Sequence, residues 1–103
     1  MLELLLDGEV EEFNRRRAAG EPAELRGANL RGADLRQLDA AGLDMSDCYL
    51  RHADLRGVDF SQTRLQGASI NGARISGAYF PPELSAEEIN LSLLHGTRMR
   101  YRT

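Results

Sequence analysis

The chain has 103 residues, a formal net charge of −3, no Trp and one Cys. This length predicts a single domain, and the small net charge gives no reason to expect a nucleic acid or a membrane surface as partner. The lone Cys excludes an internal disulfide and a Cys-based metal site. Residues 1–22 hold six acidic residues and three Arg, whereas acidic and basic residues balance in residues 23–82 and in residues 83–103.

The chain opens with a short apolar run, Met1-Leu2-Glu3-Leu4-Leu5-Leu6. No basic residue precedes this run, and it is too short for a signal peptide or a membrane span. A cytoplasmic location is therefore the default expectation.

A helix is expected over residues 8–19. Asp7 is suited to be its N-cap and Gly20 to end it, with acidic residues early and Arg residues late, as the helix dipole favours. One face of this helix would carry Val10, Phe13 and the stem of Arg17. Residues 1–22 thus read as an N-terminal capping helix.

A period of five dominates residues 23–82. Every fifth residue from the first Leu of this segment is apolar: Leu25, Leu30, Leu35, Ala40, Met45, Leu50, Leu55, Phe60, Leu65, Ile70, Ile75 and Phe80. Five residues turn an α-helix by about 500° and reach the opposite face of a strand, so this period fits neither element. The backbone must bend once in every five residues, and each bend returns the same positions to the interior.

Two further columns support these bends. The residue two positions before each large apolar residue is mostly small, as in Ala28, Ala33 and Ala53. The residue two positions after it is often Gly, which tolerates the backbone angles of tight turns. This column holds Gly27, Gly32, Gly42, Gly57, Gly67, Gly72 and Gly77, with Gln37, Asp47, His52 and Gln62 in other places.

The repeated phrase resembles the pentapeptide-repeat family. The quoted copies are Ala28-Asn29-Leu30-Arg31-Gly32, Ala33-Asp34-Leu35-Arg36-Gln37 and Ala53-Asp54-Leu55-Arg56-Gly57. The resemblance implies an all-β solenoid, a right-handed quadrilateral β-helix of about three coils built from twelve repeats over residues 23–82. The segment Phe13-Asn14-Arg15-Arg16-Arg17 is also similar to the aromatic-Asn-x-x-Arg helix that precedes the repeats in some members of this family.

Four repeats per coil would stack residues that are 20 positions apart. Phe60 and Phe80 would then lie above Ala40. The copy that contains Ala40 is inverted, because Leu38 takes the small position and Ala40 the large one. We expect this exchange to make room for Phe60 while Leu38 refills the adjacent volume.

The C-terminal segment, residues 83–103, should form a second cap. Pro81-Pro82 end the repeats, and Ser85-Ala86-Glu87-Glu88 is a capping box that predicts a helix over Ala86–Leu94 with Gly96 as C-cap. Its apolar face would hold Ile89, Leu93 and Leu94. The basic tail that follows is expected to be a frayed, solvated terminus: Arg98, Arg100 and Arg102.

No sequence pattern predicts a catalytic, cofactor-binding or metal site. The chain has no phosphate loop, nucleophile elbow or HExxH motif, and we expect no enzyme activity and no cofactor. His52 is expected on the surface and Cys48 in the core. The stacked acids Asp34 with Asp54 and Asp39 with Asp59 occupy the Asp/Asn position of the repeat, which favours a structural role.

The outward side chains are the remaining candidates for function. We expect a non-enzymatic scaffold or interaction module that binds another protein through Arg31, Arg36, Tyr49, Arg51 and Arg56. The alternative that the resemblance implies is a DNA-mimic inhibitor of a type II topoisomerase (gyrase), which the short, charge-neutral repeat region disfavours. The chain could be a monomer, or a dimer through the C-terminal helix, where Leu91 adds further apolar surface.

Overall fold

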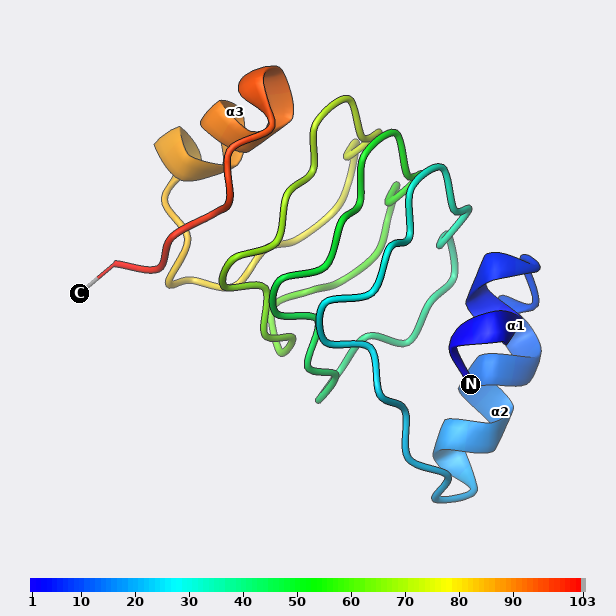
Figure 1. Ribbon diagram of the computed structural model, residues 1–103. Helices are drawn as coiled ribbons and strands as arrows, with labels where there is room; N and C mark the ends of the chain where they lie inside the picture. The colour runs from blue at the N-terminus through cyan, green and yellow to red at the C-terminus, as the bar shows by residue number, and fades with distance from the viewer. Residues whose placement is uncertain (103) are drawn as a thin grey trace.

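The computed structural model describes residues 1–102 of the chain. Figure 1 shows the repeat segment wound into stacked coils, with two helices at one end and a third at the other. The helices are α1 (Leu2–Leu6), α2 (Val10–Ala18) and α3 (Ala86–His95). We refer to residues 23–42, 43–62 and 63–82 as the first, second and third coils.

Backbone hydrogen bonds between residues about 20 positions apart hold the coils together. In one example, Tyr49 N donates to Ala28 O over 2.9 Å and Leu30 N donates to Tyr49 O over 2.8 Å. Within residues 1–102, six parallel single-residue bridges result: Asn29–Tyr49, Asp34–Asp54, Asp44–Arg64, Tyr49–Ser69, Asp54–Arg74 and Asp59–Tyr79. These pairs confirm the expected stacking of residues 20 positions apart. The bridges do not extend into strands, because residues 1–102 contain no strand, so the expected all-β class is not confirmed.

A β-turn joins one repeat to the next. In the first of them Ala28 N donates to Leu25 O over 2.9 Å, and Gly27 has a φ of 72°. A turn whose φ is positive at the third residue but not at the second is type II, and it favours Gly at the third residue. Gln37, Asp47 and His52 adopt it without being Gly, at φ values of 71°, 60° and 60°.

The Asp/Asn position of the repeat stabilises these turns. Its side-chain oxygen accepts a hydrogen bond from the backbone N–H two residues later, an Asx-turn geometry. The distances run from 2.9 Å for Asp59 with Ser61 to 3.3 Å for Asp39 with Ala41. These hydrogen bonds lower the pKa of Asp59 from its ordinary value. The geometry supports the structural role predicted for the repeat's acids.

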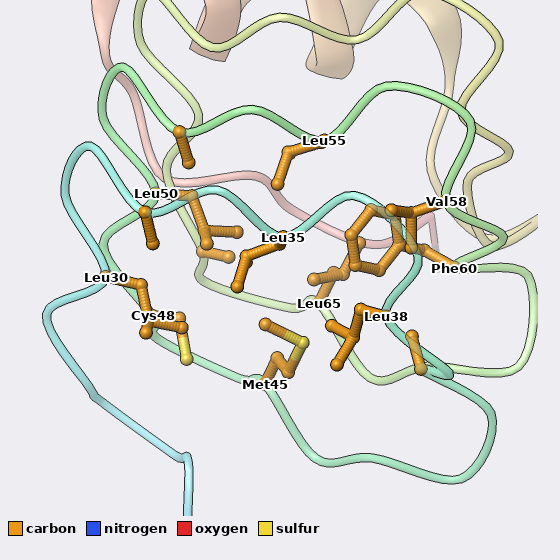
Figure 2. Packing of buried hydrophobic residues seen from close by; sticks show 14 of the residues in the cluster. Leu30, Leu35, Leu38, Met45, Cys48, Leu50, Leu55, Val58, Phe60 and Leu65 are labelled. Atoms are coloured by element: carbon orange, nitrogen blue, oxygen red, sulfur yellow. The ribbon is translucent and has the colours of Figure 1, made fainter. Parts of the chain in front are cut away.

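The large and small columns both point into the coils, as predicted. Figure 2 shows their side chains packed inside the second coil and its neighbours. Leu55 and Phe60 have exposed fractions of 1% and 0%. The Phe60 and Phe80 rings stack with centroids 6.2 Å apart. Leu38 and Ala40 of the inverted copy are both buried, so the exchange keeps the inward register.

The N-terminal end differs in part from the prediction. Residues 8–19 were expected to form one helix, but α2 begins at Val10 with Glu9 as its N-cap and without a side-chain capping bond. Asp7 is instead the C-cap of the unpredicted helix α1, so its prediction as an N-cap was wrong. Val10 and Phe13 are buried as expected, and Leu5 of α1 joins them in the core.

Side chains of α2 hydrogen-bond to the edge of the first coil. Asn14 Nδ2 donates to Gln37 O over 2.8 Å, and Asn14 Oδ1 accepts from Asp39 N over 3.0 Å. The Arg17 guanidinium donates to Asp39 O and Ala41 O over 3.2 Å and 3.3 Å. Arg17 was expected to pack through its stem, and the structure shows that its charged end caps backbone carbonyls that would otherwise lack partners.

Helix α3 begins at Ala86, as predicted, and ends at His95, one residue later than predicted. Ser85 Oγ accepts from Glu88 N over 3.1 Å, and Gly96 ends the helix with a φ of 74°. The Glu88 carboxylate does not complete the capping box, because it accepts from the backbone and guanidinium of Arg100. Leu94 was predicted on the inner face, but it is 69% exposed.

The C-terminal tail is ordered against the third coil, so the expectation of a frayed terminus was wrong. Met99 is fully buried, and its backbone accepts from Gly67 N over 2.7 Å and donates to Ala68 O over 2.8 Å. Further along, Tyr101 Oη accepts from Leu65 N over 2.9 Å. Met99 bonds to Gly67 and Ala68, and the later residue Tyr101 bonds to the earlier residue Leu65, so the tail runs antiparallel to this part of the coil. Burial of Met99 and these bonds offset the entropy of ordering the tail.

Candidate functional site

The five residues predicted to form one binding face lie on two neighbouring repeats and have different surroundings. Arg31, Tyr49 and Arg51 line one shallow hollow. Arg36 and Arg56 lie among carboxylates one repeat further along the chain. We call these the Arg31–Arg51 face and the Arg36–Arg56 face.

The Arg36–Arg56 face is neutralised by its own acids. Arg36 donates to both carboxylate oxygens of Asp34 over 2.9 Å and 2.8 Å, and Arg56 donates to both oxygens of Asp54 over 2.9 Å and 2.7 Å. Arg36 also approaches Asp54 to 3.4 Å, which links the first and second coils. The hydrogen bonds from Arg56 lower the pKa of Asp54 to about 2. Bidentate pairing of this kind occupies the guanidinium donors.

The Arg31–Arg51 face lacks this neutralisation. Arg31 and Arg51 are exposed, and within residues 1–102 neither has an Asp or Glu oxygen within 4.0 Å. The closest polar side-chain contact of Arg51 is 3.4 Å, from Nε to His52 Nε2. The hollow beside them has a volume of about 420 Å³ and is lined by Asn29, Arg31, Tyr49, Arg51, Ser69, Asn71 and Gly96. Two guanidinium groups with free donors therefore border a hollow of neutral polar groups.

The C-terminal tail adds a residue to this face that the sequence did not predict. Arg98 Nη2 donates to Tyr49 Oη over 2.6 Å, and its guanidinium carbon lies 5.3 Å from the centroid of the Tyr49 ring. Arg98 Nη1 also lies 3.2 Å from Asp47 Oδ1. The cation–π contact and the hydrogen bond fix the half-exposed Tyr49 ring beside the hollow. No repeat pattern extends into the tail, so no sequence signal placed Arg98 here.

Neither Cys48 nor His52 lines this hollow. Cys48 is fully buried, its Sγ donates to Leu25 O over 2.9 Å, and burial raises the pKa of the thiol to about 11. Such a thiol is a poor nucleophile at neutral pH. His52 is exposed, as predicted, and lies over Gly72, where a Cβ would come within 2.5 Å of its Nδ1.

Neither a metal-binding cluster nor a membrane-spanning helix is found in residues 1–102. Residues 1–102 contain no group of three His, Cys, Asp or Glu side chains placed to hold a metal ion. In the same range, none of the three helices combines the length and the apolar character needed to cross a membrane.

Comparison with known proteins gives one finding. The family model for pentapeptide repeats matches the chain in eight copies, over residues 23–37 and 44–80. The interval between these two segments contains the inverted copy Leu38-Asp39-Ala40, which departs from the repeat pattern. No curated protein and no solved structure matches the chain at a significant level. Because the matched segments cover about half of the 103 residues, the chain belongs to the pentapeptide-repeat family.

Proposed function

We propose that this chain is a non-enzymatic protein-interaction module, and that its Arg31–Arg51 face binds an acidic segment of another protein. The observation that carries the proposal is the pair of exposed guanidinium groups without acidic partners in the described residues, placed beside a polar hollow. Arg and Tyr are enriched where proteins recognise one another. A carboxylate is the group whose geometry the free guanidinium donors match.

The Arg36–Arg56 face is less suited to bind an acidic segment, which supports the choice of the Arg31–Arg51 face. The donors of Arg36 and Arg56 are already occupied by Asp34 and Asp54. An acidic partner would have to displace these carboxylates, whereas at Arg31 and Arg51 it would meet no competing carboxylate from residues 1–102. The unpaired charge is also positive, opposite to the surface that a DNA mimic needs, so the gyrase-inhibitor alternative gains no support from this face.

Partner capture with matched variants tests the proposal. The wild-type chain, Arg31→Gln/Arg51→Gln and Arg36→Gln/Arg56→Gln would each be used to capture proteins from a native lysate, followed by mass spectrometry. Both variants lose two positive charges, so a nonspecific charge effect would weaken both. We expect the first variant to lose the acidic partners and the second to retain them. Equal recovery by all three proteins would remove the Arg31–Arg51 face from consideration.

We further infer that the repeats form the right-handed quadrilateral β-helix that the family resemblance implies. The 20-residue spacing of the bridges and the turn in each repeat support four repeats per coil. Duplication of residues 43–62 should then insert one complete coil and leave the melt cooperative, since each coil contacts only its neighbours. Duplication of residues 43–57 would add three repeats and should misplace α3 and the tail. A cooperative melt of both proteins would contradict four repeats per coil.

A dimer through α3 remains a separate proposal. Leu91 is 41% exposed and Leu94 is 69% exposed, so α3 keeps apolar surface beyond what its contacts with the third coil use. Light scattering over a range of concentrations should show a concentration-dependent mass that Leu91→Ser/Leu94→Ser abolishes. A constant monomer mass would exclude this dimer.

A further inference from the structure

Part of the third coil's outer edge has backbone N–H and C=O groups without hydrogen-bond partners in residues 1–102. The bonds between the second and third coils show which groups these are. In the second coil, Leu55 N and Gly57 N donate to Arg74 O and Ser76 O of the third coil. Ala53 O and Val58 O accept from Arg74 N and Tyr79 N. The backbone of Arg74 thus accepts from Leu55 N and donates to Ala53 O of the second coil. The equivalent groups of the third coil need other partners.

The first half of the third coil has such partners. Met99 O accepts from Gly67 N and Met99 N donates to Ala68 O, so the main chain of this residue bonds both a donor and an acceptor of the edge. The other donors, Leu65 N, Ile70 N and Gly72 N, reach Tyr101 Oη, Ser92 Oγ and Leu93 O over 2.9 Å, 2.9 Å and 3.0 Å. Helix α3 and the C-terminal tail therefore supply the partners of this part of the edge, and Met99 supplies them from its main chain.

The second half of the third coil is not paired in this way. The groups equivalent to those bonded in the second coil are Ile75 N, Gly77 N, Ala73 O and Ala78 O, and none of them has a hydrogen-bond partner of this kind within residues 1–102. Side chains here are also less covered. Of the inward large residues, Leu65 and Ile70 are 1% and 0% exposed, whereas Ile75 and Phe80 are only partly buried.

We propose that the edge formed by residues 73–78 is a docking site for an extended, apolar segment of a partner protein, which adds to the third coil by backbone pairing. Alternating donors and acceptors at a coil edge match the main chain of an extended peptide. Partly exposed Ile75 and Phe80 would contact its apolar side chains. The two bonds of Met99 to Gly67 and Ala68 show that the neighbouring edge binds the main chain of another segment beside a buried apolar side chain. This site is independent of the Arg31–Arg51 face, because it uses different residues and backbone groups.

Peptide selection followed by hydrogen exchange tests the site. A phage-displayed library of random 12-residue peptides would be selected on the full-length chain, and the selected peptides synthesised. In the free protein, the amides of Ile75 and Gly77 should exchange faster than those of Gly67 and Ile70, which have partners. A bound apolar peptide should slow exchange at Ile75 and Gly77. Protection confined to other residues, or the failure of the library to yield any apolar binder, would overturn the proposal.

Two substitutions of the same charge sharpen this test. Ile75→Lys places a charge where the apolar peptide would lie and should weaken binding by about tenfold or more. Ser76→Lys adds the same charge at the adjacent exposed position and should change the affinity by less than about twofold. If Ile75→Lys does not fold, the exchange rates of the wild-type chain decide alone. A self-associated chain that already protects Ile75 and Gly77 without peptide would assign the edge to a second copy and overturn the proposal.

Discussion

The Arg31–Arg51 face and the Arg36–Arg56 face come from consecutive repeats with the same kind of turn and the same inward Leu residues, yet the arginines of one face are unpaired and those of the other are paired with acids. The difference lies two residues before each Arg. Asp34 and Asp54 pair with Arg36 and Arg56, whereas Asn29 and Tyr49 occupy the equivalent places before Arg31 and Arg51. In this scaffold, Asp-x-Arg gives a neutralised arginine, and replacement of the Asp leaves the guanidinium free to bind.

The largest expected effect comes from breaking the core that both faces share. Leu55 is 1% exposed in the second coil, and Leu55→Asp would bury a charge without a partner. We expect a loss of roughly 4 kcal/mol or more in the free energy of unfolding, enough to unfold the domain. Circular dichroism melts should show no cooperative transition, whereas Leu55→Met should melt close to the wild type. A wild-type-like melt of Leu55→Asp would mean that the inward register is wrong.

A second substitution would convert one face into the other without changing an arginine. Asn29→Asp/Tyr49→Asp supplies the missing carboxylates, so Arg31 and Arg51 should form the pairs seen at Arg36 and Arg56. We expect the affinity for an acidic partner to fall by about tenfold. Tyr49→Asn is the control, because it also loses the Tyr ring but adds no charge. An equal loss of affinity in the control would assign the effect to Tyr49 and contradict the charge argument.

The inverted repeat offers a smaller effect on stability. Ala40 is buried in the stack that contains the Phe60 and Phe80 rings, so Ala40→Leu should overpack it and lower the free energy of unfolding by roughly 1–3 kcal/mol. Adding Leu38→Ala returns the normal order of large and small residues and should recover part of this loss. Chemical denaturation of the two variants measures the coupling. Additive losses would show that Leu38 and Ala40 do not share one volume.

The smallest expected effect is on the pH dependence of stability, through the Asp54–Arg56 pair of the Arg36–Arg56 face. Hydrogen bonds from Arg56 hold the pKa of Asp54 at about 2, below its ordinary value of 3.8. A carboxyl whose pKa is lowered on folding stabilises the protein above its unfolded pKa, and this stabilisation is lost as the pH falls from about 4 to about 2. Because the pair lies at the surface, the contribution should be small and weaker at high salt. The urea midpoint of Asp54→Asn should depend less on pH over this window than that of the wild type. Identical slopes would show that this pair contributes no measurable stability.

The sequence predicted the parts of the molecule that repeat. The inward positions, the 20-residue stacking, the helix from Ala86 and its Gly96 cap follow from local patterns that recur or that capping rules describe. It did not predict the ordered tail, because Met99 pairs with Gly67 and Ala68, more than 30 positions earlier, and this contact occurs only once. Helix α1 was missed because its five residues show no helical period beyond one turn.

The candidate site divides in the same way. The exposed positions of Arg31, Arg36, Tyr49, Arg51 and Arg56 follow from the repeat register, so the sequence named all five. Their division into a paired and an unpaired set depends on which side chains meet, and the repeat pattern predicted only a structural role for the stacked acids. The contribution of Arg98 depends on the path of the tail, which no local pattern encodes.

Nuclear magnetic resonance of the arginine Nε–H groups tests the central claim most directly. The chain would be titrated with a synthetic Glu-rich peptide, and the Nε–H signals of all assigned arginines followed. We predict that the signals of Arg31 and Arg51 shift with a common binding curve, while those of Arg36 and Arg56 remain in place because Asp34 and Asp54 occupy their donors. Shifts of equal size on both faces, or shifts confined to Arg36 and Arg56, would contradict the account.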